Sequence, residues 1–378
     1  MSTNVRGRVY VRLANGGIGE TLAGARLTFM REDGSASHDI TTNNEGAYSI
    51  TLPQARYYLR TTHPDYSDYT TAPGFIVVPA EDQICNCFLL EPRVTTAIIV
   101  RHAEKLNPSS TSPEEPLSDD GHRRAEALGR ILFRAGVTTI HATNTVRALS
   151  TAEPLSKALM LPTQVYSSPS AVAASVLDSH KGDVALIVAH SNTVREFITA
   201  FGATIDVGMV SDDDYDNMFV VSRSGTSVNV LNLQYAADTG PGLAKNSAAA
   251  LNLLLVGTGN ALGSFGRAPQ RLLHAAHGAS VKAIYVHDHQ DAMVKPLATH
   301  LGLTPINYSN RGLLSLLARI RMENPTGTVV VSGPNAELRA IVKHLQGEIP
   351  ILYTTDTDNL VLLTRFTTGS VRVVPMRL

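Results

Sequence analysis

The 378-residue chain has no tryptophan, two cysteines and 6% aromatic residues. So few aromatic side chains weaken any role in stacking nucleic acid bases. A net charge of −1 supplies no attraction for nucleic acid or for an anionic membrane surface. The chain also lacks an unbroken apolar run of about 18 residues, which argues against a membrane span. The opening MSTNVRGRVYVRL has no apolar stretch typical of a secretory signal, so we expect a cytoplasmic protein.

The two cysteines, Cys85 and Cys87, lie one residue apart in the stretch ICNCFLL. On a strand they would share a face, an arrangement that rarely gives a good disulfide. Two thiols also fall short of the four ligands that a zinc site needs. We therefore interpret both as small buried apolar residues, which is consistent with a reducing compartment.

Residues 1–92 contain only short alternating runs, such as GRVYVRL, ARLTFM and AYSITL, separated by turn residues such as NGG, EDGS and NNEG. This pattern predicts a small antiparallel β-sandwich. The stretches GRVYV, LAGARLTF, TTNNEGAYSITLP and the HPDY after YYLRTT resemble the carboxypeptidase regulatory-like (transthyretin-like) module. That resemblance implies a non-catalytic domain that packs against, or presents, its neighbour.

Residues 93–235 alternate between strand and helix patterns. TTAIIV, VTTIHAT and VALIVAH are apolar, β-branched runs, and each precedes a stretch with helical spacing. Ser118 is expected to cap the first helix, with Asp119 and Asp120 in its first turn. Such alternation predicts an α/β domain with a largely parallel sheet.

Residues 236–250, AADTGPGLAKNSAAA, have the composition of a linker. Residues 251–378 then repeat the order of the preceding domain. KAIYVHD corresponds to TTIHATN, KPLATHLGLTPINYS to EPLSKALMLPTQVYS, and GTVVVSGPNAELRAIV to DVALIVAHSNTVREFI. A repeat about as long as the preceding domain, residues 93–235, indicates duplication of that whole domain. The predicted architecture is therefore multi-domain: an N-terminal β-sandwich followed by two α/β domains.

Basic side chains follow the strands of the first α/β segment. Arg101 and His102 come directly after TTAIIV, His190 directly after VALIVA, and Arg147 shortly after VTTIHAT. Ligands of open α/β sheets bind beyond the carboxyl ends of the strands, so these side chains are expected to converge there. Arginine matches phosphoryl oxygens, and a neutral imidazole can attack phosphorus. The chain has no GxxxxGK[ST] loop and no carboxylate cluster at metal spacing. The pattern predicts a phosphoryl-handling site with no metal or cofactor.

The same segment resembles the histidine phosphatase (phosphoglycerate mutase-like) superfamily. RHAE at 101–104 matches its R-H-[AG]-E signature, LSDDGHRRAEAL its helix opening, NTVRALSTAEPL its second arginine and VAHSNTV its second histidine. The resemblance implies that His102 is the nucleophile and becomes phosphohistidine. It also implies that Arg101, Arg147 and His190 hold the phosphoryl group and stabilise its charge.

The acid that would protonate the leaving group has no clear candidate. The strand end in QVYSSPSAVAASVLDSH carries Ser167 and Ser168, and Asp178 and Glu104 are weak candidates. Loss of general acid catalysis typically costs about 10²–10⁴-fold in rate. A slow phosphatase, or one whose leaving group needs little protonation, stays open.

The second α/β segment lacks the basic residues. Gly257 and Thr258 stand at the positions of Arg101 and His102, and SGPN at 332–335 contains no imidazole. The position of Arg147 falls near His289. His287 and His289 have the spacing of metal ligands, but two ligands are too few for a metal site. We therefore interpret them as a degenerate remnant of the region around Arg147. We expect a non-catalytic duplicate that supports the first domain or binds something else in the vacated crevice. The acidic run SDDDYD at 211–216 is interpreted as a solvated turn rather than a cation site.

The leading hypothesis is a metal-independent phosphomonoesterase that acts on a phosphorylated small molecule or a phosphoprotein. The alternative, from another class, is a non-enzymatic scaffold or adaptor with a protein partner on residues 1–92 or 251–378. A phosphoglycerate mutase proper is weaker, because the loop after RHAEK is short. Polar loops such as NPSSTSPEEP at 107–116 do not identify the substrate.

Overall fold

The structure is a computed structural model of the whole chain, and it divides into two compact units. One unit comprises residues 1–93 with 367–370, and the other comprises 94–366 with 371–378. The structure describes residues 2–12, 18–70, 76–78, 83–85, 88–90, 93–204, 210–236, 250–258, 267–288, 291–309, 312–345, 358–367 and 370–378. Within these ranges no helix is long and apolar enough to cross a membrane.

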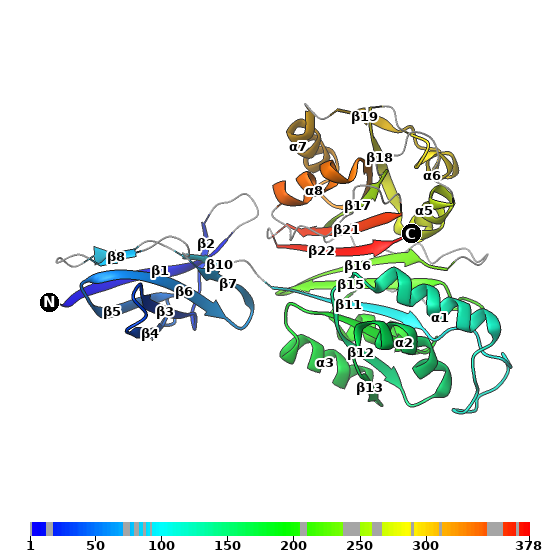
Figure 1. Ribbon diagram of the computed structural model, residues 1–378, viewed down its shortest axis with the longest axis horizontal. Helices are drawn as coiled ribbons and strands as arrows, with labels where there is room; N and C mark the ends of the chain where they lie inside the picture. The colour runs from blue at the N-terminus through cyan, green and yellow to red at the C-terminus, as the bar shows by residue number, and fades with distance from the viewer. Residues whose placement is uncertain are drawn as a thin grey trace. The chain divides into compact units, whose positions relative to one another are not determined.

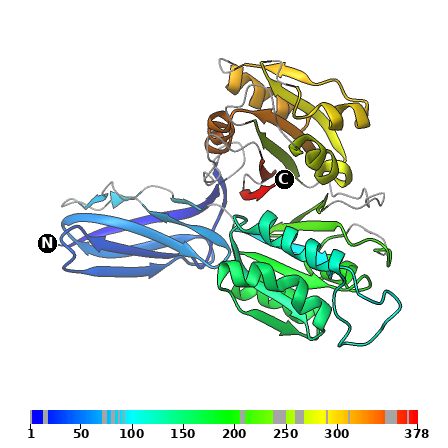
Figure 2. The same cartoon turned by 45° about the vertical axis from the view of Figure 1, so that its right-hand side comes forward.

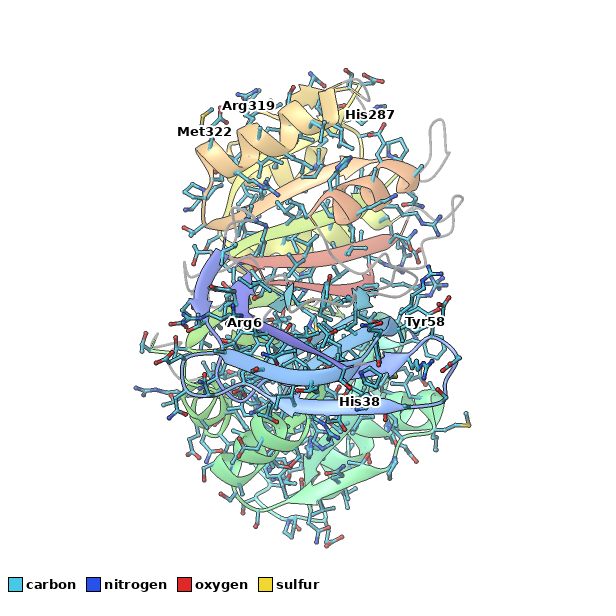
Figure 3. The ribbon with its side chains drawn as sticks, turned by 90° about the vertical axis from the view of Figure 1, so that its left-hand side faces the viewer. Arg6, His38, Tyr58, His287, Arg319 and Met322 are labelled. Carbon is cyan, nitrogen blue, oxygen red and sulfur yellow. The ribbon has the colours of Figure 1, made fainter. Side chains whose placement is uncertain are left out.

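The N-terminal unit is all β. Its strands are β1 (Ser2–Arg12), β2 (Ile18–Thr21), β3 (Arg26–Arg31), β4 (Ser37–Thr41), β5 (Ala47–Pro53), β6 (Ala55–His63), β7 (Tyr66–Thr70), β8 (Ile76–Val78), β9 (Gln83–Ile84) and β10 (Phe88–Leu90). They form two five-stranded sheets, one around β1 and the other around β3 and β6 (Figure 1). Val9 of β1 and Phe29 of β3 are fully buried in one core. Alternate residues of each strand point into this core, whereas outward positions such as Arg6 and Tyr58 remain accessible (Figure 3).

The first α/β half follows at β11 (Figure 1). Its elements are β11 (Val94–Arg101), α1 (Asp119–Leu132), β12 (Val137–Thr143), α2 (Val146–Leu159), β13 (Thr163–Tyr166), α3 (Pro169–Ser179), β14 (Val184–Ala189), α4 (Val194–Ala200), β15 (Asn217–Ser224) and β16 (Ser227–Gln234). The six-stranded sheet has the order β13-β12-β14-β11-β15-β16, in which the first four strands are parallel and β15 and β16 form an antiparallel hairpin.

The second α/β half has its own six-stranded sheet. Its elements are β17 (Ala250–Gly257), α5 (Ala268–Ala276), η1 (His277–Ala279), β18 (Val281–His287), α6 (Lys295–Leu301), β19 (Ile306–Tyr308), α7 (Leu313–Glu323), β20 (Gly327–Gly333), α8 (Asn335–His344), β21 (Asn359–Phe366) and β22 (Val371–Arg377). The order β19-β18-β20-β17-β21-β22 reproduces that of the first sheet strand for strand. An irregularity of register also recurs, between Val137 and Thr139 on β12 and between Val281 and Ala283 on β18.

Helices cover both faces of each sheet, as Figures 1 and 2 show for the second half. In the first half, Ile98 of β11 packs with Leu128 of α1 on one face. Ile99 packs with Phe197 of α4 on the other face. Every residue of β11 is buried, which agrees with its many apolar and β-branched residues.

The two α/β halves pack on each other in a reciprocal way. β16 of the first contacts α5 and η1 of the second, and β22 of the second contacts α1 of the first. Leu233 and Leu272 belong to one apolar cluster that includes residues of both halves. Asn229 donates a hydrogen bond of 3.0 Å from its side-chain amide to the Asn252 side chain. The halves accordingly form one compact unit.

The start of α1 brings the first helix onto the loop after β11. The Ser118 hydroxyl accepts a hydrogen bond of 3.1 Å from the Gly121 N–H, so the predicted cap is confirmed. The Ser118 N–H donates to the Glu104 carbonyl at 2.9 Å. A Cβ atom added at Gly121 would lie 2.3 Å from that carbonyl oxygen, so only glycine permits this approach. The helix start thereby fixes the RHAE loop.

Candidate active site

The structure brings the four basic residues predicted from the sequence to one edge of the first sheet. Arg101 ends β11, and the His102 N–H donates to the Ala189 carbonyl at the end of β14, 2.9 Å away. His190 follows β14, and its ring centroid lies 5.2 Å from that of His102. Arg147 is the second residue of α2, and its Nε lies 3.3 Å from Nε2 of His102. These contacts arise because β11 and β14 are adjacent parallel strands that end together.

One hydrogen bond orients the His102 ring. Its Nδ1 lies 2.8 Å from the Ala103 carbonyl, an acceptor only, so Nδ1 carries the proton and donates. Nε2 is then the unprotonated nitrogen, and it accepts from Arg147 Nε. The imidazole thus presents a lone pair to the side occupied by Arg147, which is the arrangement required of a nucleophile.

Burial and neighbouring cations keep both histidines neutral. His102 is only 3% exposed, and loss of hydration, opposed by the bond to Ala103 but aided by Arg101, lowers its pKa to about 3. Burial, with Arg147 and Arg101 nearby, lowers the pKa of His190 to about 4. The His102 lone pair is therefore available throughout the physiological pH range.

Arg101 is held by the segment 211–215. Its Nη1 donates to the Ser211 carbonyl at 2.8 Å and to the Asp214 carbonyl at 3.5 Å. The Tyr215 ring lies beneath the guanidinium, with 4.1 Å between Cζ and the ring centroid. Arg101 Nε is buried and makes no hydrogen bond within the described ranges. The Nη1 side of the guanidinium is therefore anchored, while the buried Nε has no hydrogen-bond partner among the described residues.

This segment agrees in part with the interpretation from the sequence and adds a contact that the sequence did not indicate. The run SDDDYD at 211–216 was expected to be a solvated turn. Asp212 and Asp213 are exposed, but the neighbouring carbonyls and Tyr215 hold Arg101, and Asp216 is buried. Sequence reasoning missed this contact because a backbone carbonyl carries no residue signature. The available signal was the tyrosine placed between acidic residues.

The loop 107–116 positions the second arginine. Arg147 Nη1 donates to the Ser112 carbonyl at 2.8 Å, and the Val146 N–H donates to the Pro113 carbonyl at 2.9 Å. Lys105 Nζ in turn donates to the Ser110 carbonyl at 2.7 Å, which agrees with a rim position. The loop 107–116 thus contacts the start of α2 through two backbone carbonyls.

His190 also has a partner that the sequence did not indicate. The Thr143 hydroxyl, at the end of β12, lies 2.9 Å from His190 Nε2. The His190 N–H donates to the Thr193 hydroxyl at 3.0 Å as the chain turns into α4. These two threonines fix the ring edge-on to His102, at an interplanar angle of 67°.

The weak candidates for the general acid lie apart from this chemistry. Arg124 of α1 donates to both carboxylate oxygens of Glu104 from Nε, at 2.9 and 3.0 Å, and from Nη2 at 2.7 Å. Arg124 also donates to the Tyr235 carbonyl at 3.0 Å. This buried pair links the RHAE loop to the end of β16. Asp178 is exposed near the end of α3.

The second half can be compared residue by residue because the strand registers agree. Arg101 of β11 pairs with Ala189 of β14, and Gly257 of β17 pairs with Gly333 of β20. Thr258 donates from its N–H to the Gly333 carbonyl at 3.0 Å, as the residue after Arg101 does in the first half. Gly257 and Thr258 therefore occupy the positions of the arginine and the histidine.

The space beside Gly257 is filled. A Cβ atom added there would lie 2.1 Å from Oδ1 of Asn335 and 3.2 Å from Cβ of Asn359. Asn335, the first residue of α8, is 2% exposed. A side-chain amide therefore occupies the space beside Gly257.

The other residues that resembled metal ligands are accounted for as follows. His287 Nε2 lies 2.9 Å from a carboxylate oxygen of Glu337 and 3.2 Å from one of Asp288. His289 lies outside the described residues, as does Cys87, and Cys85 is buried. Among the residues with described positions, no group of three or more ligating side chains forms a metal site.

Comparison with known proteins bears on this geometry. Residues 97–169 match the family model described as histidine phosphatase superfamily (branch 1). This segment is a histidine phosphatase superfamily domain. It contains β11, the RHAE loop and α2, hence His102 and both arginines. No curated protein sequence matches the chain.

Similar solved structures cover about a third of the chain. The protein histidine phosphatase SixA complexed with tungstate shares 18% identity over 33% of this chain and 86% of its own, with a TM-score of 0.28. A mycobacterial glucosyl-3-phosphoglycerate phosphatase shares 15% identity over 34% of this chain and 91% of its own, with a TM-score of 0.30. Mycobacterial hydrolase 1 shares 14% identity over 39% of this chain and 100% of its own, with a TM-score of 0.32.

Proposed function

We propose that the first α/β half is a metal-independent phosphomonoesterase that acts through a phosphohistidine at His102. The observation that supports this most strongly is the state of the His102 ring. The Ala103 carbonyl holds the proton on Nδ1, and the unprotonated Nε2 faces the guanidinium of Arg147. A neutral imidazole nitrogen beside a guanidinium group suits attack on a phosphoryl group, since the cation can bind the phosphoryl oxygens.

The proposed reaction uses each side chain in turn. Nε2 of His102 attacks phosphorus, and the bond to the leaving oxygen breaks. Arg101 and Arg147 donate to the equatorial oxygens and stabilise the charge spread over them in the transition state. His190 hydrogen-bonds the transferring group. Water then attacks the phosphohistidine, which releases inorganic phosphate and restores the neutral ring.

Direct trapping of the intermediate tests this function. The full chain mixed with ³²P-labelled aryl phosphate and quenched in alkali should carry one label per chain, stable to base and labile to acid. His102→Asn should carry none, while His122→Asn, at an exposed histidine of α1, should label normally. Turnover should be unchanged by a chelator. Failure to label the wild-type chain, or label on another histidine, would overturn the proposal.

For the second half we propose a non-catalytic role as a packing partner of the first. The support is the replacement of the two catalytic positions by Gly257 and Thr258, with Asn335 filling the space, while the reciprocal packing of β16 and β22 is kept. Residues 1–92 are proposed to be a non-catalytic module of the carboxypeptidase regulatory-like type. The substrate is proposed to be a phosphorylated small molecule or a phosphoprotein.

A further inference from the structure

Hydrolysis of an alkyl phosphate needs a proton on the departing oxygen, because an alkoxide is a poor leaving group. The acids weighed from the sequence do not meet this need: Glu104 is engaged by Arg124, and Asp178 is exposed on α3. The segment 211–215, which anchors Arg101, contains another carboxylate, that of Asp212. The proposed reaction has so far given it no role.

Asp212 lies against the phosphoryl site. Its Oδ1 lies 3.4 Å from Nη2 of Arg101 and accepts a hydrogen bond of 2.9 Å from the Ser191 hydroxyl. Ser191 directly follows His190 in the chain. The carboxylate is therefore separated from the phosphoryl position by a single guanidinium group and is oriented by a residue of the same loop.

The side chain also lies on the side where a leaving group departs. The Asp212 side chain is 88% exposed, whereas that of Arg101 is 4% exposed. The Asp212 carboxylate therefore lies at the solvent-facing opening (the mouth) of the site, and the buried nucleophile His102 lies at its inner end (the floor). Ser191 also lines a hollow of about 520 Å³ along α4, together with Asn192 and Arg195. A group displaced in line from His102 moves away from the floor toward this mouth.

We propose that Asp212 is the general acid for the leaving group, an inference that rests on the phosphatase function proposed above. Its carboxylate pairs with Arg101. A bound phosphoryl group takes over the guanidinium, which releases the Asp212 carboxyl group to face the leaving oxygen. Substrate binding thus turns an ion-pair partner into a proton donor.

The step balances as follows. The bond between His102 Nε2 and phosphorus forms as the bond from phosphorus to the leaving oxygen breaks, and its electron pair stays on that oxygen. Asp212 delivers its proton to the same oxygen, so a neutral alcohol departs. In the second step Asp212 accepts a proton from the attacking water while the nitrogen–phosphorus bond breaks, which regenerates the acid.

Two variants and two substrates test the assignment. Asp212→Asn removes the acid, and Asp213→Asn removes the same charge from the next exposed position of the same turn. p-Nitrophenyl phosphate has a leaving group that needs little protonation, whereas O-phosphoserine has an alkoxide leaving group. Asp212→Asn should lower kcat for phosphoserine by about 10²–10⁴-fold and kcat for the aryl ester only a few-fold. Asp213→Asn should change neither.

Each other result counts against Asp212. Equal loss on both substrates would make it a structural residue, and a lowered KM for both with kcat retained would make it only a competitor for Arg101. A wild-type chain that cleaves the aryl ester but not phosphoserine would show that no acid operates. Absence of His102-dependent cleavage of both substrates would instead remove the proposed phosphatase function itself.

Discussion

The two α/β sheets share their strand order and an irregularity of register in corresponding strands. They differ in the residues at the end of the corresponding strands β11 and β17. The first sheet ends β11 with Arg101 and His102, and the second ends β17 with Gly257 and Thr258. In the first, a carbonyl-lined segment holds the arginine; in the second, Asn335 fills the space. The fold can therefore be kept while the residues at the strand ends change. Core packing depends on the buried apolar faces of the strands and helices, and the residues at the strand ends do not contribute to those faces.

The largest expected effect comes from the nucleophile and its counterpart. His102→Ala should lower kcat for an aryl phosphate by about 10³-fold or more, because the proposed reaction depends on the lone pair of this ring. Thr258→Ala changes the same register position in the second half and should leave kcat unchanged. Steady-state kinetics on the two purified full-length variants makes the comparison. Equal losses would show that the second half takes part in the reaction.

The second test addresses the filled space. Gly257→Ala should destabilise the α/β unit by about 1–3 kcal/mol, because the new Cβ atom meets the buried Asn335 amide. Gly312→Ala, where a Cβ atom meets nothing within 4 Å, is the matched control and should change stability far less. Urea unfolding followed by circular dichroism measures both. If the two glycine variants proved equally stable, the space would be open after all.

The third effect is a pH dependence of stability that arises from His102 in the first half. Folding lowers the pKa of His102 from 6.5 to about 3, so between these values the unfolded chain binds a proton that the folded chain does not. This contribution to stability is fully present above pH 6.5 and is lost on acidification, by up to about 1.4 kcal/mol per pH unit. His102→Asn should therefore flatten the fall in unfolding free energy between about pH 6 and pH 4.

Thr258→Ala is the control for that measurement, since the corresponding position of the second half carries no titrating group. It should retain the wild-type slope of unfolding free energy against pH. A slope in His102→Asn equal to that of wild type would mean that the ring is protonated in the folded chain as readily as in the unfolded one. Such a result would also weaken the assignment of His102 as a neutral nucleophile.

Much of the first half could be predicted from the sequence. The apolar run TTAIIV predicted a buried strand, the Ser118 cap was placed correctly, and the residues that follow the strands meet at one sheet edge. These features are local or follow from parallel strand order, so sequence pattern is enough. The role of the 211–216 segment and the occupant of the space beside Gly257 could not be predicted, since each depends on residues distant in the chain.

By itself, the sequence determined which segments become strands and helices and which residues stand at strand ends, because apolar periodicity and capping act over a few residues. Only the tertiary structure decided what those residues contact. The carbonyls of Ser211 and Asp214 hold Arg101, Arg124 engages Glu104, and Asn335 fills the position opposite Gly257. The physical reason is that hydrogen bonds to backbone carbonyls and the filling of a space depend on the close approach of distant segments, which leaves no local pattern in the chain.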